Sequence, residues 1–355
     1  MYLEHLHLHS FRNLLKFESK KTILLGNNAQ GKSNLLEAIE LLATLKSHRV
    51  SKDRDLVLES DSEARIFARV NRLYGASELS LILRSSGRRT VIRDRQPLRR
   101  HLDFLGVINA VQFSSLDLDL VRGGPEARRD WLDTLLIQLE PLYVHILQQY
   151  NQVLRQRNAL LKEIRKQELE GKVYADLSQL KLWDLQLAET GSRVTRRRAR
   201  VLQRLIPLAQ KWHESISGKT EFLELQYIPN VPWVEDDVNG VQRAFLDKIE
   251  TRRLAEKQLG TSVVGPHRDE VDFLINQNPA KSYGSQGQQR TLVLPPLLLL
   301  DDVLAELDIE RQNQLLDAIE DRFQTLITTT HLSSFESRWL QSSQVFSVKK
   351  GHIFY

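Results

Sequence analysis

The chain has 355 residues, of which 41% are hydrophobic and 27% are charged, and it contains no cysteine. This composition is typical of a soluble protein large enough for two hydrophobic cores, and the lack of cysteine excludes disulfides and thiolate metal sites. The net charge of +5 suits a polyanionic partner without requiring one. No stretch reaches the roughly 18 apolar residues that span a bilayer, and residues 1–8 alternate like a strand instead of forming a signal peptide. We therefore expect a cytoplasmic protein without a membrane partner.

The N-terminal third of the chain predicts short strands around one strand–loop–helix unit. Residues 22–25 are apolar, a glycine-bounded loop follows, and a helix-forming run extends from Ser33 to about Lys46. Strand-like runs follow at 64–73 and 79–84, with glycine turn signals beside them.

The middle of the chain predicts helices. From about 125 to 215, apolar residues recur at steps of three and four, and Gly171 interrupts this pattern. We expect two long helices that form an antiparallel hairpin around Gly171. The proline-rich stretch 228–232 ends this zone, and strand and helix signals return from about 250.

These zones predict an α/β lobe built from both ends of the chain, with a helical arm inserted between them. We place residues 1–115 and 250–355 in the lobe and residues 116–249 in the arm. The expected fold class is α/β, with a mixed sheet and flanking helices.

Residues 26–33 match the P-loop pattern G-x-x-x-x-G-K-[ST], between an apolar strand and a helix. In such a loop the glycines let backbone N–H groups surround phosphate oxygens, and the helix N-terminus adds a favourable dipole. Lys32 is expected to reach the β- and γ-phosphates of ATP, and the Ser33 hydroxyl to bind Mg²⁺. The residues expected to contact ATP are Gly26, Asn27, Asn28, Ala29, Gln30, Gly31, Lys32, Ser33 and Asn34.

Four leucines at 297–300 precede Asp301 and Asp302. Such an apolar run suits a strand that is buried on both faces of a parallel sheet. Carboxylates at its end would hold Mg²⁺ and orient the attacking water. We expect Asp301 to be the metal carboxylate and Asp302 the general base.

The segment before this strand is similar to the signature of ABC-type ATPases, in which a serine and backbone N–H groups at a helix start face a nucleotide. The residues expected to face the ATP of a partner subunit are Ser285, Gln286, Gly287 and Gln288. Residues 305–308 follow where ABC-type proteins carry the D-loop. His331, after the apolar strand 326–330, stands where they place a γ-phosphate-sensing histidine.

These motifs together resemble the bacterial RecF family over nearly the whole chain. The segments that carry the resemblance are 11–13, 26–33, 35–39, 113–114, 117–118, 265–269, 283–290 and 299–308, together with Gly123, Pro125, Arg128 and Arg129. The resemblance implies an SMC-like, ABC-type ATPase head that dimerises around two ATP molecules and hydrolyses them slowly. It also implies binding of gapped DNA or single-strand/double-strand junctions, and cooperation with RecO and RecR in loading the RecA recombinase. Gln112 is a further candidate Mg²⁺ ligand, as the Q-loop glutamine of the wider group.

The family pattern fails in one place. A signature helix of several turns should separate Arg290 from the strand that ends at Asp301, yet six residues lie between Arg290 and the leucines. At about 1.5 Å per helical residue, that segment is too short to form a helix, turn and enter the sheet. Either residues are missing here or the signature element is truncated. We favour missing residues, which predicts a spatial break between Leu294 and Pro296.

Arginines cluster in two stretches, between 84 and 100 and between 193 and 204. Each arginine that neutralises a phosphate adds salt-sensitive affinity that does not depend on base sequence. The alternative for both clusters is a solvated surface matched by acidic residues. The candidate DNA contacts are Arg193, Arg196, Arg197, Arg198 and Arg200.

Two other functions stay open from the sequence. One is the nucleotide-binding subunit of a transporter, and the other is an architectural DNA clamp that binds ATP without hydrolysing it. The arginine-rich arm and the RecF-like motifs argue against the transporter. Phosphate release in the presence of DNA separates the three.

Overall fold

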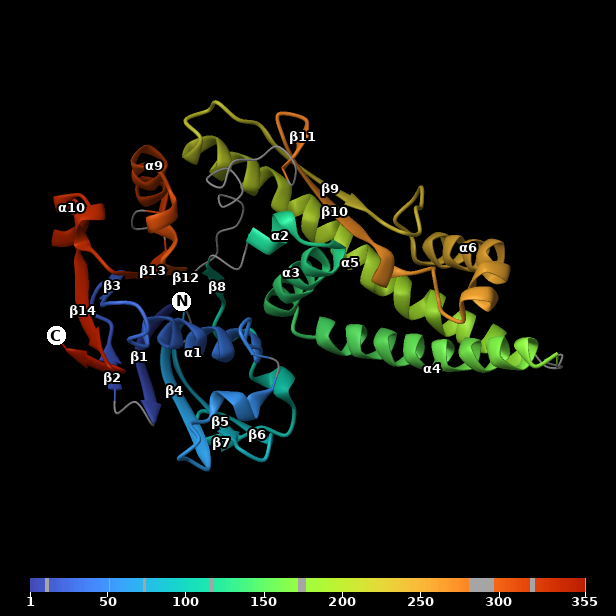
Figure 1. Cartoon of the computed structure of the whole chain (residues 1–355), viewed down its shortest axis with the longest axis horizontal. Helices are drawn as coiled ribbons and strands as arrows, with labels where there is room; N and C mark the ends of the chain where they lie inside the picture. Colours follow the sequence, from blue (N-terminus) through green and yellow to red (C-terminus); the bar gives the residue numbers. More distant parts are fainter. Residues whose placement is uncertain are drawn as a thin grey trace. The chain divides into compact units, whose positions relative to one another are not determined.

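The computed structural model describes residues 1–9, 13–50, 52–72, 75–114, 118–171, 177–280, 297–319 and 323–354 (Figure 1). The chain divides into two compact units. Unit 1 comprises residues 1–118, 209–223 and 282–355, and unit 2 comprises residues 119–208 and 224–281. The predicted boundaries differ from this division, because residues 250–281 belong to unit 2 and residues 209–223 to unit 1.

Unit 1 contains two six-stranded sheets, ordered β15-β14-β3-β13-β12-β8 and β2-β1-β4-β5-β6-β7. In the first sheet β14, β3, β13, β12 and β8 are parallel, and β15 is antiparallel at one edge. The strands of this first sheet are β3 (Lys21–Leu25), β8 (Ala110–Phe113), β12 (Leu297–Asp301), β13 (Gln324–Thr329), β14 (Ser343–Lys349) and β15 (His352–Phe354). Those of the second are β1 (Tyr2–His9), β2 (Asn13–Lys16), β4 (Glu63–Arg72), β5 (Gly75–Arg84), β6 (Arg89–Arg93) and β7 (Gln96–Pro97).

Helices cover both faces of the parallel sheet. Helix α1 (Lys32–Thr44) contacts β8, β12 and β13, and it also contacts β5 of the second sheet. On the other face Leu298 and Leu300 pack with Trp339 and with apolar side chains of α9 (Ile309–Ile319). The other helices that the structure describes in unit 1 are η1 (Asp53–Leu56), η2 (His101–Asp103), η5 (Val303–Glu306), η6 (Leu332–Ser334) and α10 (Ser337–Gln341).

The four leucines at 297–300 are at most 1% exposed, in a strand that pairs in parallel with β8 on one side and β13 on the other. This confirms the predicted strand buried on both faces. Full burial of such side chains stabilises the sheet by about 1.5–3 kcal/mol each. The Asp pair therefore stands at the carboxyl end of a central strand, the edge where open α/β sheets bind ligands.

Unit 2 is mainly helical. Among its described residues, the helices are α2 (Leu118–Arg122), α3 (Pro125–Leu139), α4 (Tyr143–Leu169), α5 (Ser178–Ile216), α6 (Val238–Leu259) and η4 (Pro266–Arg268). A three-stranded sheet, β11-β10-β9, accompanies them, made of β9 (Leu223–Ile228), β10 (Glu270–Ile275) and β11 (Asn278–Pro279). The predicted pair of long helices is present as α4 and α5, and β9 and β10, which pair in this unit, add a small sheet that the sequence analysis did not anticipate. Residues of α5 up to Leu208 belong to unit 2, and its last residues belong to unit 1.

Two buried arginines hold unit 2 together. Arg157 is 0% exposed and donates to Asp184 at 2.9 Å and to Glu256 at 2.5 Å. Arg198 is 3% exposed and donates to both carboxylate oxygens of Asp133 at 2.9 Å. Buried charges are tolerated when they are paired in this way. Both arginines are therefore parts of the core.

Candidate nucleotide-binding site

The predicted P-loop lies between β3 and α1, and its two glycines have separate structural reasons. A Cβ atom at Gly26 would collide with the carbonyl oxygen of Val348 on the neighbouring strand β14. Gly31 has a φ of 96°, a left-handed conformation that favours glycine, and it forms the N-cap of α1. The loop therefore places the N-terminus of α1 at the carboxyl end of the parallel sheet, where its N–H groups and dipole attract anions.

Lys32 lies inside this loop. It is 6% exposed, and its ammonium donates to the carbonyl oxygens of Gly26 and of Asn27, the latter at 3.0 Å. Burial lowers the pKa of Lys32, and the neighbouring carboxylates of Asp302 and Asp301 partly oppose this. The loop carbonyls hold the ammonium beside the acidic end of β12.

The two predicted Mg²⁺ ligands meet directly. The Ser33 hydroxyl donates to Asp301 Oδ1 at 2.9 Å, and the hydroxyl of Thr328 on β13 donates to the same oxygen at 2.7 Å. A hydroxyl and a carboxylate are hard oxygen donors of the kind that Mg²⁺ uses together with phosphate oxygens. In the described part of the chain, no group of three or more His, Cys, Asp or Glu side chains could hold a metal by itself. A metal at this place would need oxygens from a bound phosphate.

Asp302 adopts a left-handed backbone conformation with a φ of 55°, and its N–H donates to the Thr328 hydroxyl at 2.9 Å. Burial raises the pKa of the Asp302 carboxyl, with Asp301 adding to the rise and Lys32 and His331 opposing it. A carboxylate with a raised pKa is a stronger base. The direction of this pKa shift is the one expected of a proton acceptor.

These residues surround a cavity of about 390 Å³. It is lined by Asn28, Ala29, Gln30, Gly31, Lys32, Ser33, Asn34, Arg49, Asp301, Asp302, Thr328, Lys350 and Gly351. The cavity therefore unites the predicted P-loop with the predicted Asp pair, which the sequence separates by more than 260 residues.

Sequence reasoning missed two basic residues of this cavity, Lys350 and Arg49. Lys350 sits in the β14–β15 turn, where its N–H donates to the Gln30 side-chain oxygen at 2.7 Å and Gly351 N–H donates to the Gln30 carbonyl oxygen at 2.9 Å. Arg49 follows α1 and donates to Asn34 Oδ1 at 2.9 Å. Neither residue belongs to a motif, so tertiary contact alone reveals them.

A second cavity, of about 400 Å³, shares Asn34 and Arg49 with the first. Its walls are largely apolar and come from α1, the ends of β1 and β4, β5 and the segment around η1, including Leu41, Val57 and Ile66. The apolar cavity adjoins the charged cavity at Asn34, the residue that follows Ser33. The site thus combines a charged chamber with an apolar one.

Gln112 and His331 lie near this site without lining the charged cavity. Gln112 is paired with Leu299 in the β8–β12 ladder, and its Nε2 lies 3.4 Å from His48 Nε2. Its side-chain oxygen is buried and has no hydrogen-bond partner within the described residues. His331 is exposed after β13, close enough for its charge to affect the pKa of Asp302.

The predicted signature residues, Ser285, Gln286, Gly287 and Gln288, lie outside the described residues, and so does the expected break between Leu294 and Pro296. The D-loop segment is partly visible, because η5 follows Asp302 and the Asp308 side chain accepts a hydrogen bond from Arg311 N–H at 2.9 Å.

The candidate DNA contacts on α5 all have acidic partners. Arg193 pairs with Glu189 at 2.6 Å, Arg197 pairs with Glu140 at 3.2 Å, and Arg196 and Arg200 share one carboxylate, that of Asp236. The prediction for Arg198 was wrong, because its guanidinium is buried between Asp133 and Asp269 and no phosphate can reach it. Helical spacing turns this one arginine toward the core and the others toward solvent.

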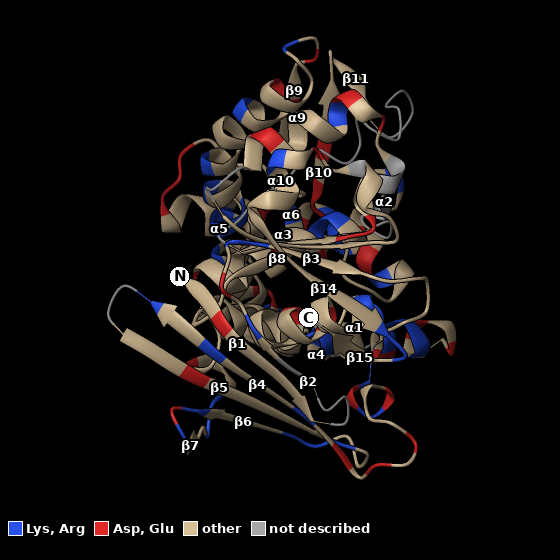
Figure 2. Cartoon of the chain, turned by 90° about the vertical axis from the view of Figure 1, so that its left-hand side faces the viewer, with Lys and Arg blue, Asp and Glu red and all other residues tan. Residues whose placement is uncertain are grey.

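The arginines between 84 and 100 are also paired in part. Arg89 donates to Asp53 at 2.7 Å and Arg95 to Glu78 at 3.1 Å. In the view of Figure 2, both basic and acidic residues are scattered over strands and helices. Neither sequence cluster forms an unbroken basic surface.

The helices of the described residues include none that is long and apolar enough to cross a membrane.

Comparison with curated proteins found close relatives. The DNA replication and repair protein RecF of Microcystis aeruginosa (strain NIES-843 / IAM M-2473) is 94% identical over 375 residues, covering 100% of each chain. That of Gloeothece citriformis (strain PCC 7424) is 69% identical over 381 residues, covering 99% of each. A scan against protein-family models found no match.

The first alignment is longer than this chain. It spans 375 positions, whereas this chain has 355 residues, so the Microcystis protein carries about 20 residues that this chain lacks.

Solved structures with the same fold fall into two groups. The recombination mediator protein RecF-ATPrS in the RecFOR pathway matches with a TM-score of 0.87 at 29% identity, over 99% of this chain and 97% of that one. The Smc head domain from Pyrococcus furiosus, with an extended coiled coil and bound to the C-terminal domain of ScpA, matches with a TM-score of 0.54 at 15% identity, over 99% of this chain and 95% of that one. The similarity to the Smc head domain concerns the fold alone.

The parallel sheet, the glycine loop at its carboxyl end and the adjoining Asp pair define an SMC-like ATPase head of the ABC type. This confirms the predicted fold class. The relatives identify it further, and the chain belongs to the RecF family of DNA replication and repair proteins.

Proposed function

We propose that this chain is an ATP-dependent DNA-binding protein of recombinational repair and replication restart. The observation that carries the proposal is the 2.9 Å hydrogen bond from Ser33 Oγ to Asp301 Oδ1, because it joins the P-loop to the end of β12 across 268 residues. Solved structures of RecF-ATPrS and RecF-ATP, with TM-scores of 0.87 and 0.86, support ATP as the ligand. The charged cavity would take the triphosphate, and the adjoining apolar cavity the nucleoside.

Ser33 and Asp301 would hold Mg²⁺. Both offer hard oxygen atoms, already within 2.9 Å of each other, and Mg²⁺ in nucleotide sites takes one or two carboxylates besides phosphate oxygens. When bound, the ion neutralises charge that develops on the phosphates.

The chain's own residues would perform the other tasks. Lys32 would hold the β- and γ-phosphates, because its ammonium already lies within the loop that surrounds them. Asp302 would orient the attacking water and accept its proton, since burial raises the pKa of its carboxyl. His331 would contact the γ-phosphate from the end of β13.

A second copy of the chain would complete the site. Ser285, Gln286, Gly287 and Gln288 would face the ATP held by the partner's P-loop, so that ATP induces a homodimer. Slow hydrolysis would then release the dimer and act as a timer. Membership in the RecF family supports this arrangement.

The proposed substrate is DNA with a gap or a single-strand/double-strand junction, bound without sequence preference. The proposed partners are RecO and RecR, which would act with this protein to load RecA in the cytoplasm. The names of the relatives, which refer to DNA repair and to the RecFOR pathway, support these expectations.

Nucleotide binding is tested by titrating wild type and Lys32→Ala with a fluorescent ATP analogue. Loss of charge-assisted hydrogen bonds of about 1.5–3 kcal/mol should weaken binding roughly 10- to 100-fold. Lys181→Ala is the matched control, because Lys181 is exposed on α5 in unit 2. Equal affinities for all three proteins would refute the site.

Dimerisation and hydrolysis are tested together by sedimentation and phosphate release with ATP and gapped DNA. Wild type should become a dimer and release phosphate, whereas Asp302→Asn should stay dimeric without release. Absence of release from wild type would favour the non-hydrolysing clamp. A rate of phosphate release that is the same with and without DNA would show that the ATPase activity does not depend on DNA.

A further inference from the structure

A groove of about 320 Å³ lies on unit 2, between α5 and the segment that follows β9. Its lining residues are Ala199, Leu202, Gln203, Ile206, Tyr227, Pro229, Pro232 and Trp233. Tyr227, Trp233 and the two prolines thus form an apolar wall. This wall faces one stripe of α5, which runs from Ala199 to Ile206. Val234, the next residue, is 101% exposed, so apolar surface continues past the groove.

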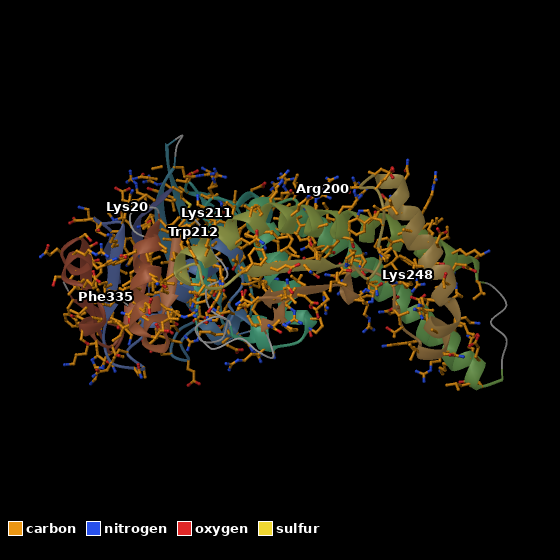
Figure 3. All side chains as sticks on the ribbon, turned by 90° about the horizontal axis from the view of Figure 1, so that it is seen from above. Lys20, Arg200, Lys211, Trp212, Lys248 and Phe335 are labelled. Carbon is orange, nitrogen blue, oxygen red and sulfur yellow. The ribbon has the colours of Figure 1, made fainter. Side chains whose placement is uncertain are left out.

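Two arginines stand beside this stripe of α5, one helical turn apart. Arg196 pairs with Asp236 Oδ1 at 2.5 Å and Arg200 pairs with Asp236 Oδ2 at 2.6 Å. The side chains of Arg200 and Asp236 are 51% and 41% exposed and that of Arg196 is 15% exposed, so the cluster reaches the surface mainly through Arg200 and Asp236. Figure 3 labels Arg200, together with Lys248 of the same unit.

The segment that carries Asp236 is anchored by other residues. Asn230 N–H donates to Asp269 at 2.8 Å, the Asn230 side chain accepts from Gly265 N–H at 2.9 Å, and Lys248 donates to the Asn230 carbonyl oxygen. At its other end Asp237 caps α6. Exposed ion pairs contribute about 0–1 kcal/mol, so the fold does not depend on the Asp236 carboxylate.

One carboxylate held by two guanidinium groups occupies the place that a phosphate would take. Arginine binds phosphate and carboxylate with the same donor geometry, and a phosphodiester could replace Asp236 on this pair. The rings of Trp233 and Tyr227 lie against the same stripe of α5, where a base could stack. Bases in a duplex are already stacked on their neighbours, so this combination fits an unpaired strand.

We propose that this face of unit 2 binds single-stranded DNA, whose phosphates displace Asp236 from Arg196 and Arg200 while a base packs against Trp233. The inference rests on the proposed DNA-binding function and locates the single-stranded part of the substrate. Asp236 is then a built-in competitor, which reduces the affinity of the groove for polyanions. Arg193, 47% exposed farther along α5, would add a phosphate contact.

The test measures binding of a fluorescently labelled oligothymidine, and of a duplex of equal length, to the full chain by anisotropy. Asp236→Asn should strengthen single-strand binding about three- to tenfold at low salt and make it more salt-sensitive, because two guanidinium groups become available. Asp247→Asn removes the same charge from an exposed position on α6 and should change binding less than about twofold.

Removal of the stacking surface should act in the opposite direction. Trp233→Ala should weaken single-strand binding about tenfold, and Trp233→Phe should restore most of it, because stacking tolerates any aromatic ring. In an Arg196→Gln/Arg200→Gln background, Asp236→Asn should have no effect on binding. Unfolding midpoints close to wild type show that each variant is folded.

The outcomes separate this inference from the proposed function. If wild type binds gapped DNA, but Asp236→Asn matches Asp247→Asn and Trp233→Ala matches wild type, the groove is not the site and DNA binding stands. Equal gains for duplex and single strand from Asp236→Asn would also overturn the inference. If wild type binds no DNA with or without ATP, both proposals fall.

Discussion

Charged side chains serve opposite purposes in the two units. In unit 1, Lys32, Asp301 and Asp302 line a cavity of about 390 Å³ and bond mainly to hydroxyls and backbone carbonyls. In unit 2, Arg157 and Arg198 are 0% and 3% exposed and are neutralised by carboxylates of their own chain. Charges that face a cavity remain available to a ligand, whereas charges that neutralise one another inside a unit stabilise the fold.

This contrast explains why one arginine cluster in the sequence contains two kinds of residue. Arg198 donates to Asp133, to Asp269 and to the Pro266 carbonyl oxygen, so all sides of its guanidinium are occupied. Its neighbour Arg200 is half exposed and has one carboxylate partner. Clustering along the chain therefore does not distinguish a DNA contact from a core residue, but burial does.

The largest expected effect comes from breaking the buried pairing in unit 2. Arg198→Ala leaves Asp133 and Asp269 without their cation, which should lower the free energy of unfolding by about 3–5 kcal/mol. Arg193→Ala, which removes an exposed helical pair, should cost less than about 0.5 kcal/mol. Chemical denaturation of both variants measures the difference, and equal midpoints would contradict the structural role of Arg198.

The second effect is a pH dependence of the free energy of unfolding, which His267 of unit 2 should cause. His267 accepts a hydrogen bond from Tyr150 and donates one to Ser262, and burial lowers its pKa from 6.5 to about 4. As the pH falls, His267 is protonated in the unfolded chain before it is protonated in the folded chain. Its contribution to the free energy of unfolding is therefore fully present above pH 6.5 and is lost as the pH drops toward 4. The loss should reach up to about 3 kcal/mol.

His267→Gln isolates this contribution, since the other titrating groups are common to both proteins. Wild type should be the more stable protein at pH 7, and its advantage should shrink steadily down to pH 4. A difference in unfolding free energy that does not change with pH would show that His267 has the same pKa in the folded and unfolded states.

The smallest expected effect is at the rim of the nucleotide site. Lys350 lines the cavity from the β14–β15 turn, so Lys350→Gln should weaken binding of an ATP analogue roughly threefold at low salt and less at high salt. Lys349→Gln is the matched control, because Lys349 does not line the cavity. Equal affinities for the two variants would remove Lys350 from the site.

Most residues of the nucleotide site could be predicted from the sequence because they belong to local motifs. The P-loop residues are adjacent in the chain, and the leucines before Asp301 report a strand buried on both faces, so Lys32, Ser33 and Asp301 could be identified without a structure. Their convergence could be expected because P-loop sites form where a strand ends at a helix N-terminus.

Other features depend on tertiary contacts that no local pattern encodes. Lys350 enters the site because the β14–β15 turn binds Gln30. The end of α5 joins unit 1 because Ile216 packs among the side chains of α9, and residues 250–281 join unit 2 because β10 pairs with β9. The apolar groove beside Arg196 likewise depends on a loop that folds back onto a helix.

Strand β3 lies between β13 and β14, which follow it by about 300 residues. During synthesis at about 5–20 residues per second, the P-loop therefore emerges from the ribosome some tens of seconds before the strands that flank it. Until Asp301 has been translated, Ser33 has no carboxylate partner from β12. A nascent chain of this protein consequently remains unable to complete its nucleotide site until translation is nearly finished.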